Sequence, residues 1–294
     1  MRAETACLPC LRALARRAVR LAAAGDPALA RRAEAECLSA LERDFRAGVS
    51  VPTRLSSALL RSVRRSSGTD DPFREVKAAE YASGREAAAR LRPQAGESLE
   101  GLLRLSGAGN QIDFFRNREE VERLWELGLP ALALDDGAKL RAALARPGDV
   151  LFLADNAGEV PFDLPLLAAL ERGGKRVLYA VKGGPSQNDV TRADAERLGL
   201  RLPGLIDTGS DAVGCELREA GEDLARAWER AGTVLAKGMA NWETLTEYPD
   251  ALRGKAVFFL LCAKCEPVAA SLGVEKGSMV LANARRVARV GAPA

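Results

Sequence analysis

The stretch Asp149-Val-Leu-Phe-Leu-Ala-Asp155-Asn156-Ala-Gly-Glu159 carries the clearest structural signal in the chain. Residues 149–154 form a short, nearly continuous apolar run, which is typical of a strand buried on both faces of a parallel sheet. An acid, an amide and a glycine follow where this run ends. In parallel sheets, ligands bind beyond the carboxyl ends of the strands. The stretch therefore predicts a buried strand and, directly after it, the beginning of a site.

The same pattern of short apolar or β-branched runs recurs along the second part of the chain. Six further strands are predicted at 131–134, 176–181, 204–206, 233–236, 257–261 and 279–281. Segments with the spacing of a helix lie between several of them, at 165–172, 191–198 and 216–229. Strands that alternate with helices in this way predict an α/β fold with a mostly parallel sheet and right-handed crossovers.

The N-terminal part of the chain has a different pattern. It is rich in Ala, Leu, Arg and Glu, and its apolar residues recur at helical spacing. Two such stripes are Leu11, Leu14, Val19 and Leu21, and Ala35, Leu38, Leu41 and Phe45. Breaks that contain Gly and Pro occur at 25–27, 48–52 and 68–72. We therefore expect an all-α helical domain over residues 1–105, followed by an α/β domain over residues 106–294 that carries the site.

Composition narrows the chemistry that is open to this chain. It has 294 residues and no histidine, which excludes Ser-His-Asp and Cys-His catalysis, histidine phosphotransfer and His-ligated zinc. The formal net charge is +3 with acidic and basic residues interspersed, so composition gives no case for nucleic-acid binding. No apolar run approaches the roughly 20 residues of a membrane span, and no signal-peptide pattern is present. We expect a cytoplasmic protein without membrane contact.

Acids, amides and lysines follow five of the predicted strands. The five loops are Asp155-Asn156-Ala-Gly-Glu159, Lys182-Gly-Gly-Pro-Ser-Gln-Asn188-Asp189, Asp207-Thr-Gly-Ser-Asp211, Lys237-Gly238-Met-Ala-Asn241-Trp-Glu243 and Cys262-Ala-Lys264-Cys265-Glu-Pro267. Asp, Asn and Gly after a strand also serve in turns and helix caps, and we assign such roles to Thr191, Thr208 and Ser210. Caps do not need lysine. The recurrence therefore predicts a site for a phosphorylated ligand and a hard divalent cation held by oxygen.

Several common motifs are absent or incomplete. The chain has no P-loop and no nucleophile elbow, and the glycines at 107–109 lack the preceding strand and third small residue of a dinucleotide fingerprint. Residues 205–210, Leu-Ile-Asp-Thr-Gly-Ser, match the local signature of aspartic proteases. That chemistry requires two aspartates that share a proton and an all-β context, so we set it aside.

Six cysteines include two C-x-x-C pairs, Cys7 with Cys10 and Cys262 with Cys265. All four thiolates together could close a metal site, and either pair could be redox-active. Because thiols of cytosolic proteins are mostly reduced, we expect free thiols at helix and strand ends.

The strand-end motifs, taken in order, resemble those of the DUF89 family of metal-dependent damage-control phosphatases. The matching segments are Asp155-Asn156-Ala-Gly-Glu159, Lys182-x-x-Pro-x-x-Asn188-Asp189-Val-Thr, Asp207-Thr-Gly-Ser-Asp, Lys237-Gly238-x-x-Asn241-Trp-Glu-Thr-Leu and Lys264-Cys-x-Pro-Val-Ala. Upstream, Gly109-Asn110-x-Ile112-Asp113 and Asp71-Pro-Phe-x-x-x-Lys77 look like earlier motifs of the family. Cys7-x-x-Cys10 looks like the mark of its prokaryotic CxxC-bearing subgroup. The resemblance covers nearly the whole chain.

The resemblance implies a helical N-terminal region and a Rossmann-like three-layer α/β/α core. It also implies hydrolysis of small phosphomonoesters, such as sugar phosphates or phosphopantetheine-like compounds, with Mn²⁺, Co²⁺, Ni²⁺ or Mg²⁺. The metal ligands would be Asp155, Asn156 and Asp189, and Lys264 would join them as a catalytic residue. The substrate-binding positions would be Asn110, Glu159, Lys182, Asn188, Asp207, Lys237, Gly238 and Asn241.

One departure from the family concerns substrate. The eukaryotic branch has Gly-Asp-x-Asn-Tyr where this chain has Gly-Met-Ala-Asn-Trp at 238–242, so an acidic contact is missing and the case for fructose 1-phosphate weakens. The leading hypothesis is a phosphatase of metabolite damage control that attacks phosphorus with metal-activated water. A non-catalytic sensor of a phosphorylated metabolite or nucleotide could use the same crevice. A methyltransferase is a third hypothesis, although no Gly-rich loop follows the first strand.

Overall fold

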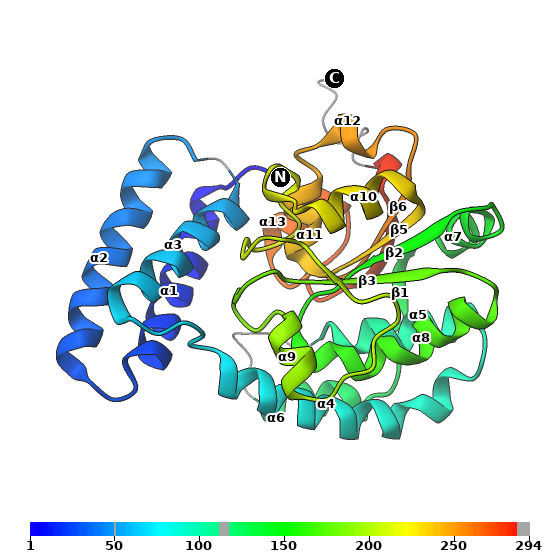
Figure 1. Cartoon of the computed structure of the whole chain (residues 1–294), viewed down its shortest axis with the longest axis horizontal. Coiled ribbons are helices and arrows are strands. Elements are labelled where there is room, and N and C mark those ends of the chain that lie inside the picture. Colours follow the sequence, from blue (N-terminus) through cyan, green and yellow to red (C-terminus); the bar gives the residue numbers. More distant parts are fainter. Residues whose placement is uncertain (50, 112–117, 287–294) are drawn as a thin grey trace.

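The computed structural model describes residues 1–49, 51–111 and 118–286. Within these residues the chain forms one seven-stranded sheet with helices on both faces (Figure 1). The strands are β1 (Leu132–Asp135), β2 (Asp149–Leu153), β3 (Val177–Val181), β4 (Ile206–Asp207), β5 (Ala231–Lys237), β6 (Ala256–Cys262) and β7 (Met279–Asn283). All seven predicted strands are confirmed, although the run predicted at 204–206 overlaps β4 only at its last residue.

The strand order is β1-β7-β6-β5-β2-β3-β4. Neighbouring strands are parallel except β6 and β7, which are antiparallel. The mostly parallel sheet predicted from the sequence is therefore present. After β2 the chain continues outward through β3 and β4, and then places β5 on the other side of β2. This reversal creates a switch point between β2 and β5, where ligands of open α/β sheets bind.

Alternate residues of β2 face two separate apolar cores. Val150 and Phe152 belong to one core, and Leu151 and Leu153 belong to the other. Helices on the first face are α4 (Arg74–Ala95), α5 (Leu99–Gly109), α7 (Gly137–Leu144) and α8 (Val160–Arg172), and those on the second are α10 (Glu222–Arg230), α11 (Gly238–Leu245), α12 (Pro249–Leu252) and α13 (Glu266–Leu272). The central part of the molecule is therefore layered helix, sheet, helix (Figure 1).

Several short elements complete the described chain. They are η1 (Thr5–Cys7), α6 (Arg118–Glu126), η2 (Ala157–Glu159), α9 (Arg192–Arg197), η3 (Leu217–Glu219) and η4 (Ala284–Arg286). The helices predicted at 165–172 and 191–198 correspond to α8 and α9. The segment predicted at 216–229 divides into η3 and α10, because Ala220 between them is extended. Thr191 caps α9 in a capping box with Asp194, which confirms the role assigned to Thr191.

The N-terminal helices α1 (Leu8–Ala23), α2 (Pro27–Arg46) and α3 (Pro52–Ser67) enclose a third core. Its members include Leu11, Leu14, Ala15, Val19, Cys37, Leu41, Leu55, Leu59 and Val63. Their separations follow the helical period, so each helix buries one stripe. The breaks between these helices coincide with the predicted Gly and Pro segments, and Asp26 caps α2 through its carboxylate.

Helices α4 and α5 pack against the sheet rather than against α1 to α3. Leu91 of α4 and Leu102 of α5 share a core with Phe152 of β2. Gly84 of α4 lies so close to η2 that a Cβ there would stand 2.1 Å from the carbonyl oxygen of Gly158. The helical region predicted over residues 1–105 is therefore divided between two cores.

Ion pairs join the two parts of the molecule. Arg61 and Arg64 of α3 bind Asp211 in the loop after β4. Lys77 of α4 is fully buried, and its Nζ lies 2.6 Å from Asp71 Oδ2 and 2.5 Å from Asp194 Oδ2. Through its ion pairs with Asp71 and Asp194, Lys77 connects the start of α4 to the start of α9.

In the described part of the chain, no helix combines the length and apolar character needed to span a membrane.

Candidate active site

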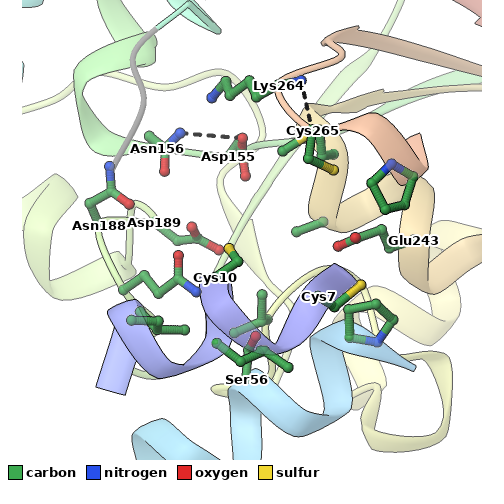
Figure 2. A pocket seen from close by; sticks show the side chains of 18 of the residues that line it. Cys7, Cys10, Ser56, Asp155, Asn156, Asn188, Asp189, Glu243, Lys264 and Cys265 are labelled. Carbon is green, nitrogen blue, oxygen red and sulfur yellow. Dashed lines mark hydrogen bonds between the residues drawn. The ribbon is translucent and has the colours of Figure 1, made fainter. Parts of the chain in front are cut away.

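A pocket of about 340 Å³ lies between the carboxyl ends of the strands and helix α1 (Figure 2). Its strand-end side is lined by Asp155, Asn156, Gln187, Asn188, Asp189, Met239, Ala240, Glu243, Lys264, Cys265 and Pro267. The opposite side is lined by Ala6, Cys7, Cys10, Leu11, Leu14, Pro52, Ser56 and Val213. The loops after β2, β3, β5 and β6 all contribute, as the position of the switch point between β2 and β5 predicts.

Asp155 and Asn156 directly follow β2 and are held by a short hydrogen-bond network. The Asn156 amide nitrogen donates to Asp155 Oδ2 at 3.3 Å and to Glu159 Oε1 at 2.8 Å. Because both donors of this amide point at carboxylates, its oxygen faces the pocket. Figure 2 shows the oxygens of Asp155, Asn156 and Asp189 directed toward the same space, with Lys264 beyond Asp155 and Asn156.

The loop that carries Asp189 is bound to the Asp155 loop through the backbone. The Val190 N–H donates to the Asp155 carbonyl at 3.0 Å, and the Ala157 N–H donates to the Asn188 carbonyl at 2.9 Å. Asn188 and Asp189 are thereby brought beside Asp155 although they follow a different strand. The Asn188 side chain also donates to Glu80 Oε2 of α4 at 2.8 Å.

Lys182 supports Asp189 from below. Its Nζ donates to the carbonyls of Ala212 and Gly214 and lies 3.3 Å from Asp189 Oδ2. Only 4% of Lys182 is exposed, and it is not among the residues that line the pocket. Its charge acts on both pocket aspartates, because it opposes the rise in the pKa of Asp155 and of Asp189.

A buried charge network lies beneath Asp155 and Asn156. Lys237 Nζ is 2.7 Å from Asp163 Oδ1 and 2.9 Å from Glu159 Oε2, and it also donates to the Ser106 carbonyl at 2.9 Å. Lys237 and Glu159 are fully buried, so contact of either with a substrate would require this network to open. Although burial disfavours its charge, Lys237 and Lys264 lower the pKa of Glu159.

Asn110 joins three elements at the site. Its amide nitrogen donates to Asp155 Oδ2 at 3.0 Å and to Glu159 Oε1 at 2.7 Å, and its oxygen accepts from the Cys262 N–H at 2.9 Å. It is fully buried, so it fixes the orientation of Asp155. Ile112 and Asp113 of the same motif lie outside the described residues.

Gly238 and Asn241 shape the start of α11. Gly238 has φ +80°, and a Cβ at this position would lie 1.9 Å from Asp155 Oδ2. Only glycine allows the Asp155 carboxylate to stand over this backbone. Asn241 is buried, and its amide donates to the Lys237 carbonyl at 2.7 Å.

Asp207 is not brought to the pocket. It lies on β4, where Arg192 Nε is 2.9 Å from its Oδ2 and its Oδ1 accepts from the Gly209 N–H. The loop after β4 supplies Val213 to the pocket instead. Thr208 Oγ1 donates to the Ser210 carbonyl, and Ser210 Oγ accepts from the Ala212 N–H, which agrees with the turn roles expected for both.

The carboxyl groups at the pocket repel one another. Burial raises the pKa of Asp155 well above its usual range, and the charges of Glu159 and Asp189 raise it further. Burial also raises the pKa of Asp189, although the pKa-lowering effect of Lys182 opposes this. Burial and like charges disfavour ionised carboxylates, and a nearby cation favours them. The two aspartates therefore form an electrostatic site for a cation.

The donor set fits a hard divalent cation. Two carboxylates and one amide oxygen face the same space, and Asp189 Oδ2 is buried without a hydrogen-bond partner, with only the Lys182 ion pair beside it. Oxygen ligands of this kind suit Mg²⁺ or Mn²⁺, which retain several waters. Among the described residues, no three Cys, Asp or Glu side chains are arranged to hold a metal ion, so the amide of Asn156 is needed to complete the set.

The six cysteines, all within the described residues, form no disulfide bond. Cys7, Cys10 and Cys265 line the pocket, whereas Cys262 is buried and its Sγ lies 3.5 Å from the Gly277 carbonyl. The four C-x-x-C cysteines therefore do not converge on one site.

The sequence did not indicate that α1 closes the pocket. Leu11 and Leu14 were recognised only as a helical stripe, and Ser56 and Val213 carried no signal. The position of Cys7 and Cys10 in the pocket was not predicted either. Helix α1 lies more than a hundred residues before the strand-end loops in the sequence, so its place at the pocket follows only from the tertiary fold.

Fold and site together define an α/β enzyme whose acidic pocket lies at the switch point of its sheet. Comparison with known proteins narrows this class. The family profile described as the damage-control phosphatase ARMT1-like domain matches residues 3–280. The chain belongs to this family, and it is a phosphatase of the damage-control type.

Named relatives agree with this assignment. The damage-control phosphatase PH1575 of Pyrococcus horikoshii is 32% identical over 288 residues, which cover 95% of this chain and 97% of the relative. A damage-control phosphatase of Archaeoglobus fulgidus is 32% identical over 245 residues, covering 78% and 82%. The crystal structure of PH1575, described as a DUF89 family protein, superposes with a TM-score of 0.84 at 31% identity, covering 96% of this chain and 99% of that chain. These matches favour the phosphatase over the sensor and methyltransferase hypotheses.

Proposed function

We propose that this phosphatase hydrolyses small phosphomonoesters in the strand-end pocket, with a divalent cation held by Asp155, Asn156 and Asp189. The observation that carries the proposal is the convergence of these oxygens in one pocket with Lys264 on its border. Mn²⁺, Co²⁺, Ni²⁺ and Mg²⁺ are the candidate ions. When bound, such an ion supplies Lewis acidity, which activates water for attack on phosphorus and neutralises phosphoryl charge.

The other residues have separate tasks in this proposal. Lys264 lines the pocket and complements the charge of the phosphoryl oxygens. Asn188 also lines the pocket and is oriented by Glu80 for a hydrogen bond to substrate. Lys182 orients Asp189, and Asn110 orients Asp155.

Lys237 and Glu159 act from beneath the pocket. Together with Asp163 they form a buried charge network that fixes Asn156 through Glu159 Oε1. Gly238 leaves room for the Asp155 carboxylate, and Asn241 holds the turn at the start of α11. Asp207 and its partner Arg192 stabilise the sheet edge.

Three finer assignments belong to the same proposal. The chain is a member of the prokaryotic CxxC-bearing subgroup, for which Cys7 and Cys10 at the start of α1 are the support. The domain division is best drawn between Gly68 and Phe73 rather than at residue 105, because α4 and α5 share the apolar core of the sheet. We also keep cytoplasmic location as a proposal.

The experiment is phosphate release from p-nitrophenyl phosphate by the purified chain, with and without each of the four metal ions. Asp155→Ala and Asp189→Ala should each lower kcat by at least about a hundredfold, on the order of losing one preorganised transition-state contact. Asp250→Asn, an exposed aspartate outside the pocket, serves as the control and should retain full activity. Wild-type rates in both pocket variants would overturn the site.

A further inference from the structure

Glu243 lines the pocket but has no task in the reaction proposed above. It lies on α11, and Figure 2 shows its carboxyl group directed into the pocket beside Cys7 and Cys265, away from Asn156 and Asn188. Burial raises the pKa of both thiols, and the charge of Glu243 raises it further, so the three groups are close neighbours. Glu243 therefore occupies an end of the pocket that lies away from the proposed metal ligands.

The carboxyl group of Glu243 has no protein partner in the part of the chain that the structure describes. No group there donates a hydrogen bond to it, and no cation forms an ion pair with it. The amino group of Met1 is the positive charge that acts on it, but this group donates to the backbone carbonyl of the same residue and to Thr246 and Glu247. The two neighbouring thiols are weak donors. Burial accordingly raises the pKa of Glu243 to about 7, although the Met1 charge opposes this rise.

The other acidic side chains among the described lining residues do have partners. Asp155 accepts a hydrogen bond from Asn110, and Asp189 forms an ion pair with Lys182. Both aspartates also face the space proposed for the divalent cation (Figure 2). Glu243 differs from them, because neither a protein group nor the proposed cation compensates its carboxyl group. When a ligand fills the pocket, the partner of Glu243 must come from that ligand.

A ligand that fills the pocket excludes water from Glu243. An apolar group at this end would leave the carboxyl group without a hydrogen bond, which costs at least about tenfold in affinity. A hydroxyl group donates to the ionised carboxylate and accepts from the protonated acid, whereas an ammonium group satisfies the ionised form alone. Ser56 and Gln187 also line the pocket, but an unpaired neutral group costs less than an unpaired charged one. Glu243 therefore sets the stronger requirement, which is for a hydrogen-bond donor.

The charges of the pocket oppose an anionic group near Glu243. Lys264 is the one Lys or Arg among the described residues that line it, whereas Asp155, Asp189 and Glu243 are acidic. A phosphoryl dianion balances the charge of one divalent cation, which leaves the acidic side chains in excess over Lys264. A second phosphate or a carboxylate on the substrate would therefore meet like charge at Glu243. A neutral or positively charged donor is favoured there.

We propose that Glu243 determines specificity by binding a hydrogen-bond donor on the alcohol part of the substrate, at the end of the pocket away from the phosphoryl group. Hydroxyl and ammonium groups share this chemistry and differ in charge. The inference rests on the proposed function, because it takes the phosphoryl group to lie at Asp155, Asn156 and Asp189. It assigns Glu243 to substrate selection and not to the reaction step.

The test compares phosphate monoesters of equal size that differ in their terminal group. Butyl phosphate, 3-hydroxypropyl phosphate and 3-aminopropyl phosphate end in a methyl, a hydroxyl and an ammonium group, and two further sets lengthen the chain by one and by two methylenes. The different lengths let the terminal group reach Glu243 from the proposed phosphoryl position. Phosphate release with Mn²⁺ gives kcat/KM for each ester. In at least one set, the wild-type chain should favour the hydroxyl or the ammonium ester over the methyl ester by at least about tenfold.

Two variants locate the preference and identify the donor. Glu243→Leu removes the acceptor at similar size, so the ratio of kcat/KM for the preferred ester to that for the methyl ester should fall at least about tenfold. Glu243→Gln retains a neutral acceptor, so it should keep a preference for the hydroxyl ester and lose a preference for the ammonium ester. Glu229→Leu makes the same change in an exposed residue of α10 and should leave every ratio unchanged. Because all esters meet the same sample, the ratios do not depend on the folded fraction.

The outcomes separate this inference from the proposed function. Equal or better hydrolysis of the methyl ester in every set would overturn the requirement for a donor while leaving the phosphatase intact. A donor preference that persists in Glu243→Leu would overturn the assignment to Glu243. Absence of phosphate release from all the esters and from p-nitrophenyl phosphate would overturn the proposed function itself.

Discussion

Substitution of Gly238 by alanine tests how closely the backbone of α11 supports Asp155. The added Cβ would lie 1.9 Å from Asp155 Oδ2 and 2.4 Å from its Cγ, so the carboxylate must rotate away. Rotation breaks the hydrogen bond from Asn110, which measures 3.0 Å. We therefore expect a loss of activity that exceeds the loss of stability.

The stability change has two parts. Alanine at φ +80° costs roughly 1–2 kcal/mol in backbone strain. Loss of the Asn110 hydrogen bond to a carboxylate adds about 1.5–3 kcal/mol. Gly254→Ala provides the matched control, because Gly254 has φ +79° and nothing within 4 Å of the added Cβ. It should show only the first part.

The assay combines urea unfolding, followed by circular dichroism, with phosphate release from p-nitrophenyl phosphate. Gly238→Ala should be about 2 kcal/mol less stable than Gly254→Ala and should lose at least about a hundredfold in kcat. Gly254→Ala should keep wild-type kcat. Equal stability of the two variants would refute the close contact, and wild-type kcat in Gly238→Ala would refute the role of the Asp155 position.

Two further predictions concern buried charges. Lys77→Met leaves Asp71 and Asp194 as uncompensated carboxylates and should lower the free energy of unfolding by about 3–5 kcal/mol. Lys139→Met, which removes an exposed partner of Asp136, should cost at most about 1 kcal/mol in the same urea titration. Burial raises the pKa of Glu243 to about 7 from an ordinary value of 4.5, so the unfolded chain ionises first as pH rises. Ionisation of Glu243 should therefore lower the free energy of unfolding between about pH 4.5 and 7, by up to about 3 kcal/mol. Glu243→Gln should remove this contribution and leave that of Glu80, whose pKa burial also raises to about 7. An identical pH dependence in both proteins would contradict the raised pKa of Glu243.

The strands could be predicted from the sequence because each is a short apolar run bounded by polar turns. The strand predicted at 204–206 begins two residues before β4, because β4 has only two residues, which are too few for a periodic signal. The division of the helices between two cores could not be read from their periodicity. The apolar stripe of a helix shows which of its faces is buried. The stripe of α4 does not show whether a helix or a sheet packs against that face.

The strand-end rule placed Asp155, Asn156, Asn188, Asp189 and Lys264 in one pocket because parallel strands deliver their carboxyl ends to one edge. It did not separate side chains that line the pocket from those beneath it. Lys237 is the last residue of β5 and turns inward to Asp163, whereas Lys264 lies two residues beyond the end of β6 and lines the pocket. Asp207 shows a further limit, because Arg192 holds it at the sheet edge.

The central claim is that Asp155, Asn156 and Asp189 hold one divalent cation, and equilibrium dialysis of the metal-free chain against Mn²⁺ tests it most directly. The wild-type chain and Asp250→Asn should each bind about one Mn²⁺ per chain, and Asp189→Ala should bind at least about tenfold more weakly, as expected for loss of a carboxylate ligand. Mn²⁺ binding by Asp189→Ala with wild-type stoichiometry and affinity would contradict the account.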